Sequence, residues 1–293
     1  MNGPANARLP DGRLHLQHGP IDLVIESFGE QEEVEAAYRQ AWDRFQDILQ
    51  TLVDELAVLR TPLGAAYPLV RGPVAERMVA AVWPYRSVFI TPMAAVAGAV
   101  AEEMLEAMLA GRSLRKAYVN DGGDIAFWLG NGESFRAGVV ENISAPAIGA
   151  SVEIRSHDAA RGIATSGWRG RSQSLGIADA VTVLARTASQ ADAAATLIAN
   201  AVNVDHPAIR RLPARVVKED SDLRELPVTV EVGALPLDAV RNALANGHAV
   251  ARRMQRARLI EAAYLALQGG QRICGNESTG LRTSPPPTLS TCA

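Results

Sequence analysis

Apolar residues along much of the chain recur every three or four positions, the spacing that places them on one face of a helix. A proline suited to the first turn opens two of these segments, at Pro73 and Pro92. The segment after Pro92 begins almost without large side chains, so we expect a helix buried against a sheet. The predicted helices span residues 31–59, 73–83, 91–111, 189–202 and 236–267, with a break at Asn246-Gly247.

Short segments rich in β-branched and aromatic residues, separated by Asn, Asp and Gly, predict strands. The spacing between them is too short for many crossovers and favours an antiparallel arrangement. Residues 1–20 are expected to be a loose lead-in, and the Ser-, Thr- and Pro-rich residues 275–293 a disordered tail. The predicted strands are residues 21–25, 117–119, 125–129, 135–140, 151–155, 162–165, 180–185 and 227–232.

Composition narrows the classes of partner. The formal net charge of −3 over 293 residues gives no overall attraction to nucleic acid or to anionic lipid. The two cysteines, Cys274 and Cys292, lie near the C-terminus and lack metal-ligand spacing. A structural disulfide framework is not expected, which fits a reducing compartment. The first residues contain no apolar core of a signal peptide, and the longest apolar run is too short for a membrane helix. We therefore expect a cytoplasmic protein that binds neither nucleic acid nor membrane.

Three short segments carry candidate chemistry within the predicted strands. In the sequence VNDGGDI, Gly122, Gly123 and Asp124 could bring backbone amides close to a phosphate, or could form a plain hairpin turn. The segment GIATSG ends in Thr165, Ser166 and Gly167, which either donate hydrogen bonds at a strand tip or simply leave the strand. In the loop that follows, Arg169 and Arg171 could hold a pyrophosphate by forked hydrogen bonds, or lie in solvent.

A fourth segment, SQADAAAT, places two oxygen-bearing side chains on a predicted helix. Asp192 and Thr196 are four residues apart, so they share one helix face and could bind Mg²⁺. The alternative is structural, because Ser189 and Asp192 have the spacing of a capping box and Thr196 could bond the carbonyl one turn back. The sequence alone favours neither interpretation.

Taken in order, the segments MAAVAGAVAEEM, VNDGGDI, GIATSG, ADAVTVLA and SQADAAATLIANAVN resemble the ApbE-like superfamily, whose members include Mg²⁺-dependent FAD:protein FMN transferases. The resemblance covers residues 85–205 and is greatest to an uncharacterised ApbE-related branch. It implies an α+β fold, with an antiparallel-rich sheet packed around central helices, in one domain over residues 21–274. It also implies that Asp192 and Thr196 bind Mg²⁺, and that the glycine turn and the T-S-G strand end lie near FAD or FMN.

The chain departs from the transferases at two places. They carry a Lys-Gly-Tyr-Ala-x-Asp helix start, where this chain begins with Ala97-Gly98, and a His-Ile-x-Asp-Pro loop, where it has residues 169–179 without His or Pro. Two functions follow from the resemblance. One is an enzyme that cleaves the FAD pyrophosphate and transfers FMN to an acceptor protein or to water. The other is a non-catalytic ligand-binding or accessory protein of cofactor or sulfur metabolism.

Overall fold

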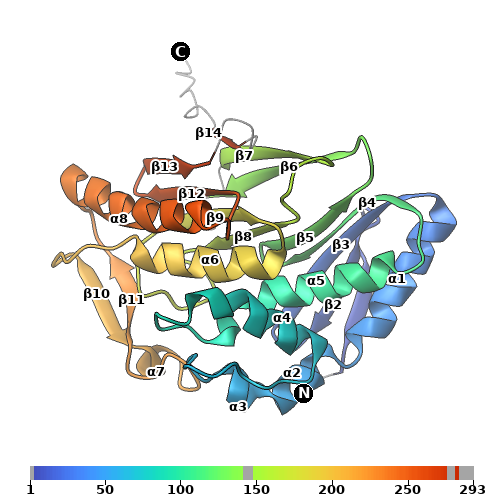
Figure 1. Cartoon of the computed structure of the whole chain (residues 1–293), viewed down its shortest axis with the longest axis horizontal. Helices are drawn as coiled ribbons and strands as arrows, with labels where there is room; N and C mark the ends of the chain where they lie inside the picture. The colour runs from blue at the N-terminus through green and yellow to red at the C-terminus, as the bar shows by residue number, and fades with distance from the viewer. Residues whose placement is uncertain (1–2, 141–147, 276–280, 284–293) are drawn as a thin grey trace.

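A nine-stranded antiparallel sheet forms the centre of the molecule in this computed structural model, which describes residues 3–140, 148–275 and 281–283 (Figure 1). Every strand in it pairs antiparallel with its neighbours, as the short predicted spacings indicated. In spatial order the strands are β1 (Ala5–Arg8), β2 (Leu14–His18), β3 (Ile21–Gly29), β4 (Leu114–Asp121), β5 (Asp124–Leu129), β8 (Gly162–Ser166), β9 (Ala180–Ala185), β12 (Ala262–Leu267) and β13 (Gly270–Cys274).

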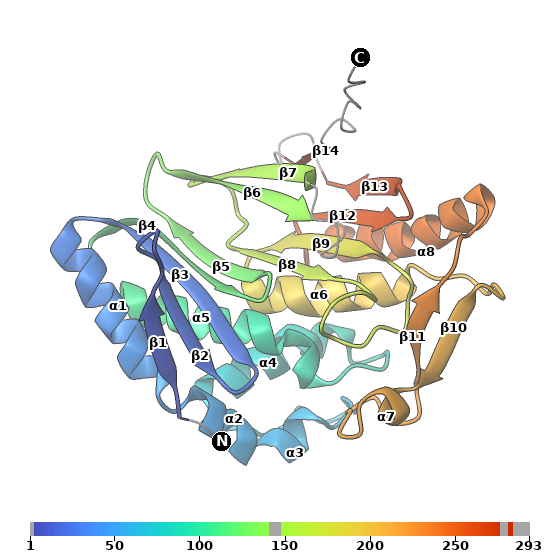
Figure 2. The same cartoon turned by 180° about the vertical axis from the view of Figure 1, so that it is seen from behind.

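Two smaller sheets flank the main one (Figure 2). The first has three strands, in the order β14 (Leu281–Thr283), β7 (Ile148–Arg155) and β6 (Ser134–Val140). It packs on the main sheet through an apolar cluster in which Val152 and Ile154 meet Phe127, Leu129 and Ile163. The second is a two-stranded arm of β10 (Ile209–Pro213) and β11 (Pro227–Val232), which carries the short helix α7 (Ala214–Val217).

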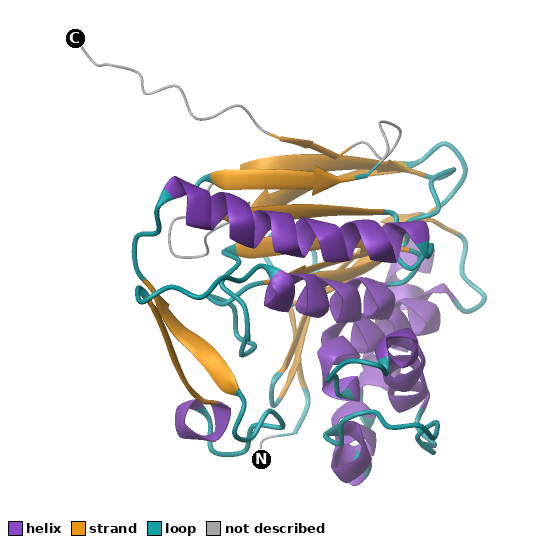
Figure 3. Ribbon diagram, turned by 60° about the vertical axis from the view of Figure 1, so that its left-hand side comes forward, coloured by secondary structure: helices purple, strands orange, loops and turns teal. Residues whose placement is uncertain are grey.

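Helices cover the opposite face of the main sheet (Figure 3). The helix α6 contacts β8 and β9, α5 contacts β4 and β5, and α8 lies over α6, β12 and β13. The helices are α1 (Gln31–Phe45), α2 (Ile48–Asp54), α3 (Leu56–Leu59), α4 (Pro73–Val82), α5 (Val96–Leu109), α6 (Ala188–Ala201) and α8 (Leu237–Arg256), with 3₁₀ turns η1 (Trp83–Tyr85) and η2 (Pro92–Ala95). The predicted α+β class, with an antiparallel-rich sheet packed around central helices, is confirmed.

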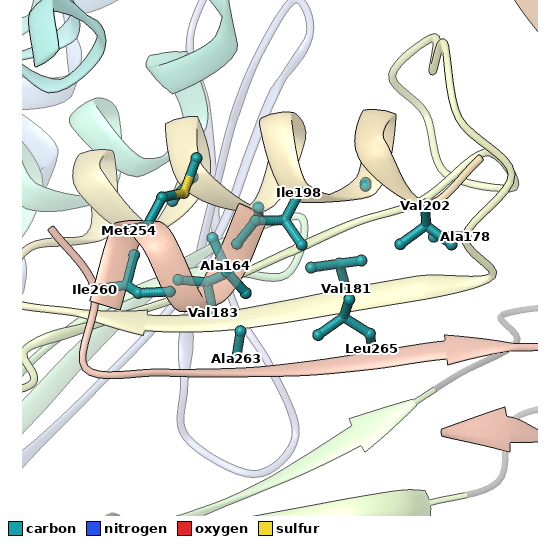
Figure 4. Close-up of a cluster of buried hydrophobic side chains, with 14 of the residues drawn as sticks. Ala164, Ala178, Val181, Val183, Ile198, Val202, Met254, Ile260, Ala263 and Leu265 are labelled. Atoms are coloured by element: carbon teal, nitrogen blue, oxygen red, sulfur yellow. The ribbon is translucent and has the colours of Figure 1, made fainter. Parts of the chain in front are cut away.

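The core between these helices and the sheet is built mainly from aliphatic and alanine side chains (Figure 4). Ile198 of α6 and Val202, the residue that follows the helix, meet Val181 and Val183 of β9, and all four side chains are fully buried. Alanine is frequent on the buried side of α6, which lets the helix approach the sheet closely. No helix among the described residues combines the length and the apolar character that crossing a membrane requires.

The N-terminal prediction was wrong. The described residues 3–20 are not a loose lead-in, because β1 and β2 add two strands to the sheet and Leu14 and Leu16 are buried. The sequence of β2, LHLQH, does alternate apolar and polar residues, which is the pattern of a strand. The alternation is short, however, and the residues around it are typical of turns. Most of the predicted disordered tail lies outside the described residues, while its residues 281–283 form β14 and pair with β7.

Two predicted helices also differ from the structure. Residues 31–59 form three helices instead of one, and at the second break the carboxylate of Glu55 accepts hydrogen bonds from the amides of Arg71 (2.6 Å) and Gly72 (2.9 Å). The helix α8 runs through Asn246-Gly247 without a break, and Gly247 lies so close to Val202 that a Cβ atom there would overlap the valine side chain. It ends at Arg256, and after a short connection the last residues of the predicted helix, Ala262–Leu267, form the strand β12. This strand is buried on both faces and therefore has no strand periodicity.

Gly98 allows α5 and α6 to cross in close contact. A Cβ atom at this position would overlap the carbonyl of Ala188 and lie 2.6 Å from the amide nitrogen of Ser189. At an unobstructed helical position Gly→Ala raises stability. Here we expect Gly98→Ala to lower the free energy of unfolding by about 1–3 kcal/mol, because the two backbones must separate.

Urea denaturation measures this change, and Gly64→Ala is the control, since a Cβ at Gly64 meets no atom within 4 Å. A Gly98→Ala protein at least as stable as the wild type would contradict this account of the contact.

Candidate functional site

A two-residue hairpin between β4 and β5 carries the first group of candidate residues. Asp121 and Asp124 face each other across the hairpin, and Gly122 and Gly123 form its turn with φ angles of 62° and 111°. The side chain of Asn120 accepts a hydrogen bond from the amide of Gly123 at 2.8 Å. Both φ angles lie in the region that favours glycine. The segment is thus a hairpin turn, and the same turn lines a cavity.

The end of β8 lies directly beside this hairpin. The amide of Thr165 donates a hydrogen bond to Asp124 Oδ1 at 3.1 Å, and its hydroxyl lies 2.8 Å from that of Thr182. Ser166 follows at the strand end, and Gly167 lies so close to the carbonyl of Asp179 that a Cβ atom there would overlap it. The second predicted segment therefore belongs to the same wall as the first.

Helix α6 presents Asp192 to the cavity through a reciprocal contact with α5. Asp192 Oδ2 accepts a hydrogen bond from the amide of Gly98 in the first turn of α5, at 3.1 Å. In return Glu102 of α5 accepts one from the amide of Ser189 in the first turn of α6, at 2.6 Å. Each helix thus supplies a carboxylate to the positive end of the other.

The capping box considered for α6 is not formed. Its N-cap residue is Thr187, whose hydroxyl accepts a hydrogen bond from the amide of Gln190 at 3.3 Å. Ser189 lies inside the helix, and Asp192 caps α5 rather than its own helix. Thr196 lies one turn after Asp192, and both side chains line the cavity.

The loop after β8 brings two arginines to the same region. Arg169 pairs with Asp179 at 3.3 Å and lies over the ring of Trp168, with 4.3 Å between its Cζ atom and the ring centroid. Arg171 extends toward the hairpin, where its Nη2 atom lies 4.0 Å from Asp121 Oδ1. Its side chain is 64% exposed.

All ten predicted site residues line one cavity of about 520 Å³. They come from the hairpin, the end of β8, the loop after it, and α6. The structure thus brings together residues that are up to 74 positions apart, from Gly122 to Thr196. Their binding roles stay a prediction. These residues are Gly122, Gly123, Asp124, Thr165, Ser166, Gly167, Arg169, Arg171, Asp192 and Thr196.

A second cavity, of about 250 Å³, adjoins the first. The loop after α7 forms part of its wall, held by a hydrogen bond from the hydroxyl of Thr91 to Asp222 (2.6 Å) and by an ion pair between Arg60 and Asp220 (3.0 Å). Sequence reasoning missed this cavity, because its residues carry no local motif. The junction residues, which line both cavities, are Ala97, Asp124, Arg171, Ser172, Asp192 and Thr196.

The carboxylates of Asp121, Asp124 and Asp192 are buried or partly buried, whereas most aspartates lie in solvent. Burial raises the pKa of Asp121 and of Asp124 to about 7, although the charge of Arg171 opposes the shift at both. Burial also raises the pKa of Asp192 well above its usual value, and the charge of Asp124 adds to this. A cation near these groups would favour their charged forms. Asp121 was missed as a site residue, although it lies within the VNDGGDI segment.

In the part of the chain that the structure describes, no three His, Cys, Asp or Glu side chains are arranged to hold a metal by themselves. The donors that the cavity does offer are carboxylate and hydroxyl oxygens, which suit a hard cation that completes its coordination with water or phosphate oxygens. The chemistry of the donor set therefore fits Mg²⁺ held together with a phosphate ligand.

Fold and site together define an α+β protein with a glycine-lined, carboxylate-rich cavity bounded by the β4–β5 hairpin, the end of β8, the loop after it, α6 and the three-stranded sheet. The chain belongs to the family described as AbpE bacteria, whose model matches residues 6–273. This confirms the predicted membership of an ApbE-related branch.

Similar sequences include two proteins that are each called "UPF0280 protein". The one from Methanothrix thermoacetophila is 40% identical over 136 residues, which cover 45% of this chain and 54% of the relative. The one from Methanothermobacter thermautotrophicus is 38% identical over 133 residues, which cover 45% and 50%. The chain therefore spans about half the length of these relatives in the matched region.

Two solved structures resemble the whole chain more distantly. The flavinyl transferase ApbE of Pseudomonas stutzeri has a TM-score of 0.46 at 11% identity, covering 94% of both chains. The ApbE protein of Thermotoga maritima has a TM-score of 0.44 at 13% identity, covering 94% of this chain and 97% of the other. With TM-scores below 0.5 and identities of 11% and 13%, these structures do not indicate which residues of this chain form a site.

The raised pKa values predict how stability depends on pH. Asp121 and Asp124 take up protons near 3.8 in the unfolded chain but near 7 in the folded protein. Between these values the folded state binds more protons, so raising the pH weakens the fold. We expect the melting temperature of the ligand-free protein to fall from about pH 5 to about pH 8.

Asp121→Asn should make this fall smaller, whereas Asp205→Asn, at an exposed acid outside the site, should leave it unchanged. Differential scanning fluorimetry across the pH range measures both. A wild-type melting temperature that stays level or rises over this window would argue against charged, buried carboxylates in the site.

Proposed function

We propose that the two adjoining cavities bind FAD together with Mg²⁺, and that the protein cleaves the FAD pyrophosphate and transfers FMN to a hydroxyl acceptor. The observation that carries this proposal is the junction of the cavities. A dinucleotide has two bulky halves joined by a pyrophosphate, and here two cavities of about 520 and 250 Å³ meet at carboxylate, hydroxyl and guanidinium groups. Membership of the AbpE family, and the resemblance of the chain's segments to FAD:protein FMN transferases, support a flavin as the ligand.

Asp192 and Thr196 are the residues that would hold Mg²⁺. They project from successive turns of α6 into the junction, and Mg²⁺ commonly takes one or two protein oxygens while phosphates and water complete its coordination. When bound, the ion would supply positive charge to the pyrophosphate oxygens as the P–O bond breaks. The hydrogen bond from Gly98 to Asp192 fixes the direction of the carboxylate before any ligand arrives.

The remaining polar groups would orient the nucleotide. Arg171 lies at the junction and Arg169 nearby, where their forked donors suit phosphate oxygens. The glycine turn lets the ligand approach the backbone closely, and Thr165 and Ser166 supply hydroxyl groups on the neighbouring wall. In the reaction, the acceptor oxygen bonds to the FMN phosphorus, the P–O bond to AMP breaks, and the acceptor proton passes to AMP or solvent.

A second candidate is a protein that binds FAD without cleaving it. Ala97 lines the junction at the position where the resembling transferases carry a lysine, so this chain lacks that ammonium group. The loop with Arg169 and Arg171 likewise replaces the histidine-containing loop. Both differences take away groups that could take part in the reaction, while the cavity that would bind the ligand is still present.

Asp192→Asn tests the proposed reaction with little change of shape. The asparagine carbonyl can still accept the hydrogen bond from Gly98, so the fold should remain, but the negative charge for the cation is lost. With FAD, Mg²⁺ and a serine- or threonine-containing acceptor, we expect the wild type to release AMP. The variant should release it at least about 100-fold more slowly.

Chromatography of AMP measures turnover, and quenching of flavin fluorescence measures binding. Thr196→Val should also slow the release of AMP, whereas Asp205→Asn, at the exposed acid, should not. FAD binding without AMP from protein acceptors or water would establish the non-catalytic candidate, and the absence of FAD binding would reject both.

A further inference from the structure

Among the six junction residues, Arg171 is the one with a basic side chain. It lines both cavities, and its Nη2 atom lies 4.0 Å from the carboxylate of Asp121, whose side chain is only 6% exposed. Its charge lowers the pKa of both Asp121 and Asp124 against the effect of burial, so the guanidinium faces the acidic end of the hairpin. Within the described residues, no other ion pair to Asp121 is formed.

The guanidinium of Arg171 lies where a side chain on residue 122 would be. A Cβ atom on Gly122 would overlap Nη2 and lie 2.9 Å from Cζ and 3.4 Å from Nε of Arg171. The next residue, Gly123, differs in this respect, because a Cβ atom there would meet no atom within 4 Å. Both glycines have positive φ, so backbone conformation alone does not distinguish them.

We propose that Gly122 is a positioning residue for Arg171: its missing side chain leaves the space that holds the guanidinium at the junction of the two cavities, where it receives the phosphates of a nucleotide. This inference rests on the proposed function for the identity of the ligand. The attraction of Asp121 places Arg171 there without a ligand, which reduces the ordering needed on binding.

A methyl group at position 122 is expected to displace the guanidinium of Arg171. The overlapping atoms are the end of a flexible, 64% exposed side chain, so the guanidinium moves away and the fold persists. Gly122→Ala should therefore act on ligand affinity through Arg171, in addition to the strain of alanine at positive φ. Gly111→Ala and Gly132→Ala serve as controls that carry the same kind of strain, since both glycines have positive φ and open space around them, and neither lines the two cavities.

The experiment compares Gly122→Ala, Arg171→Ala, their double variant, and the two control glycine variants. The dissociation constant for FAD in the presence of Mg²⁺ is measured by flavin fluorescence, and that for ADP by calorimetry. We expect Arg171→Ala to weaken both by about 10-fold, the loss of one charge-assisted contact. Gly122→Ala should weaken them similarly, the double variant should lose nothing further, and the controls should stay within about 2-fold.

The outcomes separate this inference from the proposed function. If the wild type binds FAD and Gly122→Ala behaves like the control variants, or if its effect adds fully to that of Arg171→Ala, the positioning role is rejected and the proposed function stands. If the wild type binds ADP but not FAD, the flavin assignment fails and the ADP measurements decide the positioning role. If neither nucleotide binds, both are rejected.

Discussion

The close contact between α5 and α6 at Gly98 is the constraint on which the site depends. Without a side chain at this position, the two helix starts approach until Glu102 reaches the amide of Ser189 and Asp192 reaches the amide of Gly98. The exchange satisfies amides that the first turn of a helix otherwise leaves without partners. It also turns Asp192 away from its own helix and toward the cavity, so the packing of two helices fixes the direction of a candidate metal ligand.

The same packing has an electrostatic consequence. Asp121, Asp124 and Asp192 are held close together where burial disfavours their charged forms, and the nearby compensating cation, Arg171, lies largely in solvent. Because these carboxylates are largely removed from solvent, their charged forms lower the free energy of unfolding at neutral pH, which apolar side chains in the same places would not do. A bound cation or an ordered Arg171 would offset that loss, so ligand binding and the protonation of these carboxylates are linked.

The sequence alone predicted those features of the fold and the site that form within a single short segment. The glycines of VNDGGDI determine a hairpin turn, and the spacing of Asp192 and Thr196 places them on one helix face. The sequence did not predict features that depend on contacts between residues far apart along the chain. The strand β12 is buried on both faces and has no alternation to read, and Gly247 belongs to a packing contact with Val202 rather than to a helix break. The second cavity likewise requires Thr91 to meet Asp222, which no local pattern indicates.

The structure also divides the site into a rigid part and an adaptable part. Asp124 and Asp192 are fixed by hydrogen bonds from the backbone amides of Thr165 and Gly98, so the oxygens offered to a cation have set directions. The groups offered to an anion are the long side chains of Arg169 and Arg171, which are 41% and 64% exposed. Cation geometry is demanding for Mg²⁺, whereas a guanidinium can follow a phosphate through several orientations. The site therefore combines carboxylates of fixed direction with exposed guanidinium groups on the loop after β8, the combination that the proposed function needs for its cation and its phosphates.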